Sequence, residues 1–284
     1  MTEQPRAIES GYEMQLRPHQ AEELFDHEHR LIFSIGGVGS GKSAVAGLII
    51  IDRSSFDVSQ RGGLFATTSK QLQQTIIPEV FKWLDLARID YVYGRQPPEK
   101  WKARWKRFGI QTPSPLANHA GVITLDSGLQ LVTGSLHSDA FMQFRSFQFG
   151  FAIIEEATAG MKKDALSYII ERVRCGIGEE ACKAAGHRHQ IFVHGNPPDS
   201  PDHWIYDYLE KMDPKAYRMI SSSSYDNVDA IGSEYIEGLL GTMDRETADL
   251  RIHGKLVRNK TGRAYSGFDE VNKHPVRYDP SRTL

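Results

Sequence analysis

The feature that most constrains the fold is the stretch IFSIGGVGSGKSAVAG, residues 32–47. It contains the spacing G-x-x-x-x-G-K-S from Gly36 to Ser43, with an apolar run before it and an apolar helical pattern after it. A strand, a glycine-rich turn and a helix in this order form the loop that binds the phosphates of a nucleoside triphosphate. The sequence therefore predicts a phosphate-binding loop at the end of a buried strand.

The residue types in this loop predict separate roles. Backbone N–H groups from Gly37 to Ser43 are expected to converge on the β-phosphate, because glycines allow close backbone approach and the helix dipole attracts an anion. Lys42 would bridge β- and γ-phosphate oxygens, and the Ser43 hydroxyl would bind Mg²⁺. The predicted nucleotide-binding residues of the loop are Gly36, Gly37, Val38, Gly39, Ser40, Gly41, Lys42 and Ser43.

A second stretch, FQFGFAIIEEA (residues 147–157), supplies two carboxylates after an apolar run. The run Phe149–Ile154 predicts a central strand that is buried on both faces. Glu155, at its end, is placed to join Ser43 in binding Mg²⁺. Glu156 would point differently and polarise the attacking water, so that Glu156 and Lys42 are predicted catalytic residues.

Apolar runs alternate with helical patterns along the chain, which predicts an α/β fold with a mostly parallel sheet and helices on both faces. Strands are expected at 31–35, 64–67, 149–154 and 190–194, and a hairpin over 121–135. Helices are expected at 42–51, 162–173 and 203–209, with another that Ser69 caps, on which Leu72, Ile76, Val80 and Trp83 share helical spacings.

The separation of Lys42 from Glu155 leaves room for a strand–helix–strand excursion, so another strand is expected between the two motif strands. That strand and the catalytic glutamate are typical of the additional-strand, RecA-like branch of P-loop NTPases. An N-K-x-D motif for reading guanine is missing, since NKTG and NKHP lack the aspartate. ATP is therefore the expected nucleotide and Mg²⁺ the expected cofactor.

Composition excludes several other classes of protein. The formal net charge of −2 gives no global attraction to nucleic acid, so any such contact must be local. No apolar run approaches the roughly 20 residues of a membrane span. Two cysteines indicate a reducing compartment. Cys175, Cys182, His187 and His189 lack the tight C-x-x-C spacing of a zinc site, so no metal is assigned to them.

The segment KWKARWKR, residues 100–107, has five basic residues and two tryptophans one helical turn apart, within an unusual basic and aromatic region at 94–118. Such a segment can bind DNA phosphates and stack on bases. The alternative, which we favour, is a solvated basic face with Trp101 and Trp105 packed inward.

Taken together, these motifs resemble the ATPase domain of the large terminase subunit of tailed bacteriophages, from about Leu16 to Asp269. LRPHQ (16–20) is similar to the adenine-contacting segment of that family, which makes Gln20 the expected base reader. VHGNPP (193–198) is similar to its coupling motif, in which Asn196 would sense the γ-phosphate. SSYDN (223–227) and GRAYSGF (262–268) resemble its domain end and the entry into its nuclease domain.

The stretch FRSFQFGFAIIEEA (144–157) departs from the family at two positions. Glu155 stands where Asp is more common, and Ser146 replaces the glycine that usually follows the arginine. Arg145 is the predicted finger that acts on the ATP of a neighbouring subunit. A salt bridge or a contact with DNA is the alternative role of this arginine.

The resemblance implies an organisation and a set of partners. Residues 1–255 would form the ATPase domain, and 256–284 a linker and the start of a nuclease domain that this chain does not contain. Sequence-independent binding of double-stranded DNA, a portal protein, a small terminase subunit and a homo-oligomeric ring are implied. The expected location is the host cytoplasm, at the procapsid portal. A helicase-like ATPase, a kinase and an ATP-binding interaction module are the alternatives.

Overall fold

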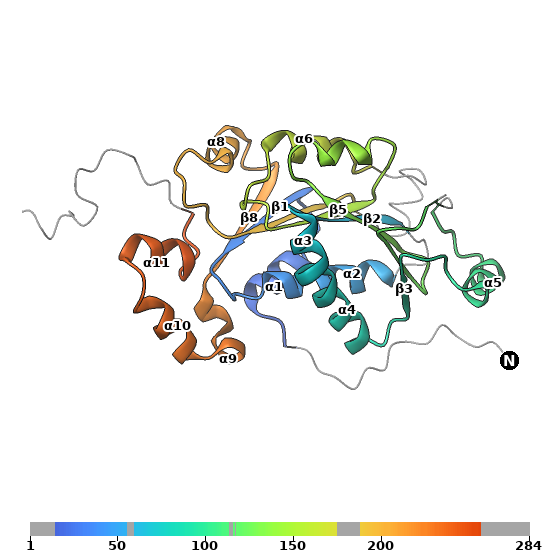
Figure 1. The fold of residues 1–284 in the computed structure, drawn as a ribbon, viewed down its shortest axis with the longest axis horizontal. Helices are drawn as coiled ribbons and strands as arrows, with labels where there is room; N and C mark the ends of the chain where they lie inside the picture. Colours follow the sequence, from blue (N-terminus) through green and yellow to red (C-terminus); the bar gives the residue numbers. More distant parts are fainter. Residues whose placement is uncertain (1–14, 56–59, 114–115, 117, 175–187, 257–284) are drawn as a thin grey trace, which may run out of the picture.

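The computed structural model describes residues 15–55, 60–113, 116, 118–174 and 188–256. In this part of the chain, eight strands form one sheet in the order β3-β4-β5-β2-β6-β7-β1-β8 (Figure 1). From β5 to β8 the neighbouring strands are parallel, whereas β3 and β4 pair antiparallel at one edge. The strands are β1 (Leu31–Gly36), β2 (Arg61–Ala66), β3 (Tyr91–Tyr93), β4 (Val122–Leu125), β5 (Gln130–Ser135), β6 (Phe151–Glu155), β7 (Ile191–Gly195) and β8 (Tyr217–Ser222). The prediction of a mostly parallel sheet is confirmed.

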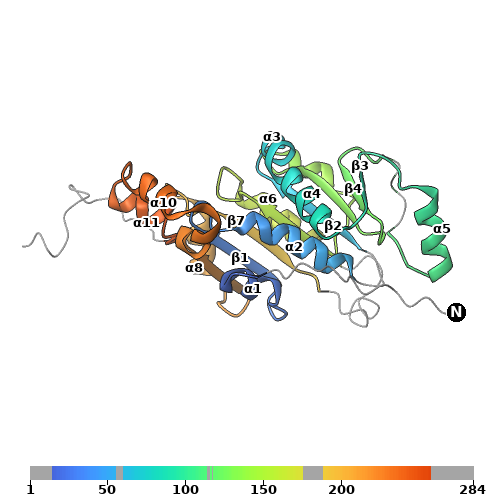
Figure 2. The same cartoon turned by 90° about the horizontal axis from the view of Figure 1, so that it is seen from below.

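Helices cover both faces of this sheet, as predicted (Figures 1 and 2). One face carries η2 (Ala140–Phe144), α6 (Lys163–Arg172) and α8 (Trp204–Lys211). The other carries α2 (Lys42–Ser54) and α4 (Ile77–Leu86), with α1 (Pro18–Leu24) beside α2. Side chains along a strand alternate between the two cores: Phe33 packs under α8 and Ile32 packs against the α2 face.

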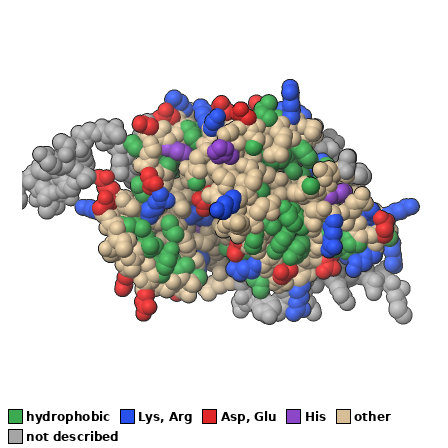
Figure 3. Space-filling view, in the orientation of Figure 1, with side chains coloured by type: hydrophobic (Ala, Val, Ile, Leu, Met, Phe, Trp, Pro, Cys, Tyr) green, Lys and Arg blue, Asp and Glu red, His purple; other side chains and the backbone are tan. Residues whose placement is uncertain are grey.

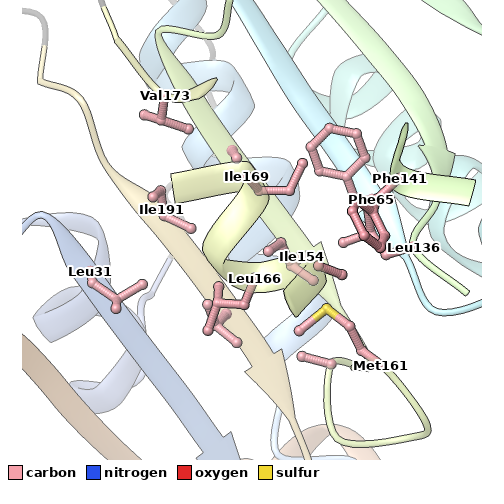
Figure 4. Packing of buried hydrophobic residues seen from close by; sticks show 14 of the residues in the cluster. Leu31, Phe65, Leu136, Phe141, Ile154, Met161, Leu166, Ile169, Val173 and Ile191 are labelled. Atoms are coloured by element: carbon pink, nitrogen blue, oxygen red, sulfur yellow. The ribbon is translucent and has the colours of Figure 1, made fainter. Parts of the chain in front are cut away.

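The central strands are apolar on both faces, which is why their sequences read as continuous apolar runs. Figure 4 shows the core under α6, where Leu166 and Ile169 meet Ile154 and Ile191 of the strands. These four side chains are fully buried. A packed core therefore holds β6 and β7 against α6.

The N-cap of the helix expected near residue 69 lies one residue earlier than predicted. Thr68, and not Ser69, is the N-cap, because its hydroxyl accepts the N–H of Gln71 while the Gln71 side chain bonds back to Thr68. The helix runs through α3 (Ser69–Gln71), a π-helical segment η1 (Leu72–Ile76) and α4. Its predicted apolar positions Leu72, Ile76 and Val80 are buried.

Two parts of the fold lie at opposite ends of the sheet. The antiparallel edge carries α5 (Glu99–Phe108), whose Trp101 and Trp105 are buried against Val92. Beyond β8 follow η3 (Ser224–Asn227), α9 (Val228–Ile231), α10 (Ser233–Leu240) and α11 (Arg245–Arg251). Among the described residues, no helix is both long and apolar enough to span a membrane. The expected linker and nuclease entry at 257–284 lie outside the described residues, as do Cys175, Cys182 and His187.

Candidate nucleotide-binding site

Three parallel strands bring the predicted site residues to one edge of the sheet. β1 ends at Gly36, β6 at Glu155 and β7 at Gly195. β7 lies between β1 and β6, which confirms that a strand separates the two motif strands. The reason inferred from the sequence was wrong, because β7 follows both motifs. The strand formed between Lys42 and Glu155 that pairs with β6 is β2, on the far side of β6.

Side chains hold every carbonyl group of the phosphate loop from residue 36 to residue 41. The Lys42 ammonium donates to the carbonyls of Gly36 (3.0 Å) and Gly37 (2.8 Å). The next four carbonyls accept from side chains of η3 and α1: Val38 from Ser224 Oγ (2.7 Å), Gly39 from Asn227 Nδ2 (2.8 Å), Ser40 from His19 Nε2 (2.9 Å) and Gly41 from Gln20 Nε2 (3.2 Å). Lys42 thus holds two of these six carbonyls from within the loop, and groups outside the loop hold the other four.

These hydrogen bonds to the carbonyls determine where the backbone N–H groups of the loop point, because a trans peptide directs its N–H opposite to its C=O. Holding the carbonyls of Val38, Ser40 and Gly41 leaves the N–H groups of Gly39, Gly41 and Lys42 facing the other way. Among the described residues, none accepts a hydrogen bond from the N–H of Gly39 or Gly41. Lys42 is the first residue of α2, where N–H groups lack helical partners. These N–H groups fit the predicted phosphate site.

The expectation that all N–H groups from Gly37 to Ser43 face a phosphate was too broad. The N–H of Gly37 donates to the Ser222 carbonyl (2.8 Å), and that of Val38 to the Arg251 carbonyl (2.7 Å). The N–H of Ser40 donates to Gly37 within the loop. Gly39 and Gly41 have φ of 72° and 95°, a left-handed backbone that favours glycine, which explains their place in the motif.

Lys42 is buried, with 8% of its surface exposed, beside the two predicted acids. Burial lowers the pKa of its ammonium to about 8, against the raising effect of Glu156, Glu155 and Glu23. The glutamates and the lysine therefore share one electrostatic environment, as the motifs predict. A buried ammonium beside unbonded N–H groups makes a site for a polyanion.

Ser43 and Glu155, the two predicted metal ligands, contact each other. The Ser43 hydroxyl donates to Glu155 Oε2 at 3.3 Å, and the Glu155 side chain is buried. Both offer hard oxygen ligands, which suit Mg²⁺. The described residues contain no cluster of three or more His, Cys, Asp or Glu that could bind a metal unaided.

Glu156 begins a sharp change in chain direction at the end of β6. Its φ of 54° is left-handed, which costs a residue with a side chain about 1–2 kcal/mol. The Thr67 hydroxyl, at the end of β2, donates to the Glu156 carbonyl at 2.7 Å and helps to hold this turn. Burial and the charge of Glu155 raise the pKa of the Glu156 carboxyl, opposed by Lys42 and His194. A raised pKa suits the predicted proton acceptor.

The acid at the metal site also belongs to a buried array that the sequence did not predict. His194 Nδ1 lies 2.6 Å from Glu155 Oε1, and His194 Nε2 lies 2.5 Å from Glu23 Oε1. All three side chains are at most 1% exposed. Burial alone lowers the pKa of the imidazole, but the charges and hydrogen bonds of Glu23 and Glu155 outweigh it and raise the pKa to about 10. Two carboxylates from different elements therefore flank one buried imidazole.

Gln20 contacts the loop, and both the oxygen and the nitrogen of its side-chain amide already form hydrogen bonds. It is buried, with Nε2 donating to the Gly41 carbonyl and Oε1 accepting the N–H of Arg17 at 3.0 Å. The structure thus gives Gln20 a part in shaping the loop. Its predicted role as adenine reader stays a prediction.

Asn196 and Arg145 occupy different surroundings. Asn196 is half-buried directly after β7, between the ends of β1 and β6, where a γ-phosphate sensor is expected. Arg145 is exposed just after η2, and its side chain has no hydrogen bond or ion pair with any other described residue. The salt bridge considered for Arg145 is thus not formed within the described residues.

Further residues that support the loop come from α1, before it in the chain, and from η3, far from it in sequence. His19 and Glu23 were missed, although they recur with the predicted Gln20 at helical spacing in PHQAEEL, so that one face of α1 meets the site. That spacing was a usable signal. For Ser224 and Asn227, in the segment interpreted as the domain end, only the fold shows that η3 wraps around the loop.

A mostly parallel sheet with an inserted strand, a glycine-rich loop that caps α2, and paired acids at the end of β6 are the features of the P-loop NTPase fold of the additional-strand type. Solved structures with this fold include large terminases of bacteriophages. A large terminase from a thermophilic bacteriophage, in complex with ADP, has a TM-score of 0.63 and 14% identity, with 85% of this chain and 54% of that chain covered. A second structure of the same terminase, in complex with ATP-γ-S, gives 0.60 and 14%, covering 86% and 53%.

The ATPase domain of the Thermus phage P74-26 large terminase has a TM-score of 0.51 and 13% identity, and the match covers 87% of this chain and 95% of that domain. The chain thus spans about half the length of the first terminase and nearly all of the P74-26 domain. No protein-family model and no curated protein matches the sequence. The resemblance predicted from the motifs is confirmed at the level of the fold.

Proposed function

We propose that the chain is the ATPase motor domain of a viral large terminase, which hydrolyses Mg·ATP to move double-stranded DNA into a procapsid. One observation supports this most: Lys42, Ser43, Glu155 and Glu156 meet at one edge of a sheet whose fold is that of large terminases. The terminase structures with ADP and ATP-γ-S support nucleotide binding by that fold.

In the proposed reaction, unbonded N–H groups of the loop and the Lys42 ammonium bind the triphosphate and stabilise charge on it as the γ-phosphoryl leaves. Ser43 and Glu155 would hold Mg²⁺, which supplies further neutralisation of phosphate charge when bound. Glu156 accepts the proton of the attacking water, and its turned backbone separates it from Glu155. Asn196 would report on the γ-phosphate from the strand between the two motifs.

Arg145 is proposed to act on the ATP of a neighbouring subunit in a homo-oligomeric ring. Its exposure and its lack of a partner in the described residues support a role at a subunit contact. An arginine finger contributes about 10³-fold or more to turnover in comparable enzymes. The portal protein and the small terminase subunit are the other proposed partners, at a procapsid in the host cytoplasm.

For DNA, the proposed contact is the basic face of α5. Its tryptophans are buried, so stacking on bases is not available to them, in agreement with the inward packing that we favoured. Arg104 and Lys102 pair with Asp126 and Glu99. The exposed cations that remain on α5 are Lys100, Lys106 and Arg107, and Arg95 is exposed just before it. Lys and Arg side chains gather at this edge of the molecule (Figure 3). They would bind backbone phosphates without sequence preference.

The test is ATP turnover of the wild type, Glu156→Ala and Arg145→Ala, with and without procapsids that carry their portal. Strong stimulation of the wild type by the procapsid is expected, and little turnover by either variant. Arg174→Ala, which also removes an exposed arginine, is the matched control and should behave as wild type. Phosphate transfer to an added acceptor without release of free phosphate would contradict the proposal in favour of a kinase.

A mixing experiment separates action between subunits from action within one. Glu156→Gln subunits retain Arg145, and Arg145→Ala subunits retain an intact hydrolytic site. If the finger acts on the neighbour, rings assembled from both variants regain part of the procapsid-stimulated turnover. No recovery in mixed rings would place the action of Arg145 within its own subunit.

A further inference from the structure

After α11 the chain returns to the phosphate loop and lies directly against it. The Val38 N–H donates to the carbonyl of Arg251, the last residue of α11, at 2.7 Å. Gly254 has a φ of 64°, and a Cβ atom on it would lie 2.7 Å from the Gly37 nitrogen and 2.1 Å from the Ser222 carbonyl oxygen. Only a glycine allows this approach, so the segment after α11 fits closely against the loop.

The Arg251 side chain contacts a second part of the site. Its Nη2 donates to Asp199 Oδ2 at 2.5 Å. Asp199 is the third residue after Asn196, the expected sensor of the γ-phosphate. Pro197 and Pro198 lie between the two and are buried. Because each proline fixes its own φ, this connection is stiff. One residue thus contacts both the phosphate loop and the segment that carries Asn196.

We propose that Arg251 is a positioning residue: its carbonyl holds the Val38 N–H and its guanidinium holds Asp199, so that Asn196 keeps a fixed place relative to the phosphate loop. The inference rests on the proposed function, because it takes Asn196 as the sensor of the γ-phosphate. Arg251 itself touches neither nucleotide nor metal in this account.

The register of the sheet explains why the place of Asn196 matters. β7 pairs with β1 up to Gly195 and Ile35, so Asn196 leaves the sheet where the phosphate loop begins. Beyond that point the strands no longer pair, and the ion pair between Arg251 and Asp199 joins the two parts instead, across 52 residues of sequence.

Stability alone does not account for the Arg251–Asp199 pair. Its side chains are 33% and 66% exposed, and exposed ion pairs contribute little to the free energy of unfolding. Such a pair can still determine where a segment lies. A shift of about 1 Å in a group that positions the reactants can lower a rate about 10²-fold. The effect of this pair is therefore expected in turnover rather than in stability.

The experiment separates kcat from KM for ATP turnover in the presence of procapsids. Arg251→Gln removes the guanidinium and keeps the backbone carbonyl that bonds Val38. We expect kcat to fall about tenfold, with KM and the affinity for ADP unchanged, because the loop keeps its backbone contact. Asp199→Asn should give the same loss, since it removes the other half of the pair. The double variant should lose no more than either single variant, because both remove one interaction.

Lys255→Gln is the matched control. Lys255 pairs with Asp249 at 2.6 Å, and the two side chains are 53% and 34% exposed, so this is a second exposed ion pair in the same region. It lies within one short stretch of the chain, between residues six apart. Its loss should leave kcat unchanged.

A wild-type kcat in Arg251→Gln, or losses that add in the double variant, would overturn the inference. A loss in ADP affinity instead of kcat would also overturn it, as would an equal loss of kcat in Lys255→Gln. If Arg251→Gln does not fold, Asp199→Asn decides alone, because Asp199 is exposed: a tenfold lower kcat supports the inference, and a wild-type kcat contradicts it. A wild type that releases no phosphate from ATP would instead overturn the proposed function.

Discussion

Two regions of the molecule carry several charged side chains each: the edge of the sheet where β1, β6 and β7 end at the phosphate loop, and the edge formed by β3 and β4, where α5 lies. Their surroundings are opposite. At the loop, Lys42, Glu155 and His194 are buried and contact other polar groups of the site. On α5, Lys100 and Lys106 are exposed to solvent and lie over a packed pair of tryptophans.

The difference teaches how far a charged residue indicates chemistry. Burying a charge costs free energy that only pairing or function offsets, so buried charges at one edge indicate a site. Exposed charges cost little and serve solubility as well as binding. Substitutions at the buried charges should therefore change activity far more than substitutions on α5.

The largest effect is expected at the proposed proton acceptor. Glu156→Gln should lower ATP turnover by about 10²–10⁴-fold, because it removes the general base, while nucleotide binding persists. Phosphate release measures the turnover, and titration with a fluorescent nucleotide measures the affinity. The matched control is Glu99→Gln on α5, whose side chain is 86% exposed and which should not change turnover. Equal losses in the two variants would remove the distinction between the edges.

The second-largest effect is expected from the side chains that donate hydrogen bonds to the carbonyls of the phosphate loop. His19→Ala leaves the Ser40 carbonyl without its donor and frees the peptide that aims the Gly41 N–H. We expect a loss of about 1–3 kcal/mol in the free energy of unfolding, the usual cost of an unsatisfied buried group, and weaker ADP binding. Chemical denaturation and ADP titration check this. His27→Ala removes an exposed histidine nearby and should change neither quantity. Unchanged ADP affinity in His19→Ala would mean that these hydrogen bonds to the loop carbonyls do not shape the phosphate site.

The raised pKa of Glu156 predicts a pH dependence of stability. A carboxyl whose pKa is higher in the folded state holds its proton longer there, so folding is favoured below the ordinary value of 4.5 and loses stability as pH rises through the folded pKa. Relative to Glu156→Gln, the wild type should therefore become less stable as pH rises above 4.5. Denaturant unfolding at several pH values measures the difference. A difference that grows in favour of the wild type would contradict the burial argument.

The smallest effect is expected on α5. Replacing Lys100, Lys106 and Arg107 by Gln should reduce the slope of log affinity for DNA against log salt by about 0.9 for each phosphate that the variant no longer neutralises. The free energy of unfolding should stay within about 0.5 kcal/mol of the wild-type value. The control replaces Lys162, Lys211 and Lys215, exposed residues elsewhere, with the same change in net charge. Equal reductions in both triple variants would mean that α5 does not bind the DNA.

The local parts of the site were predictable from the sequence. The path from β1 through the loop to α2 follows from an apolar run, left-handed glycines and a helical pattern, which lie within one short segment. The same holds for β6 and its two acids. Neighbouring residues alone decide these features, so periodicity and spacing are sufficient.

The remainder depends on contacts between distant segments. Glu23 and His194 are 171 residues apart, and Ser224 meets Val38 across 186 residues. The local sequence of α1 or of β7 cannot predict that the Glu23 carboxylate contacts the His194 imidazole. β8 was missed because it is an edge strand with mixed burial, and β3 because it is only three residues long.

The most direct test is a crystal structure of the chain with Mg²⁺ and a non-hydrolysable ATP analogue. We predict the triphosphate on the Gly39–Ser43 backbone beside Lys42, with the metal between the Ser43 hydroxyl and Glu155, and Glu156 facing the γ-phosphate. A nucleotide bound elsewhere, or a metal that ignores Glu155, would contradict the account.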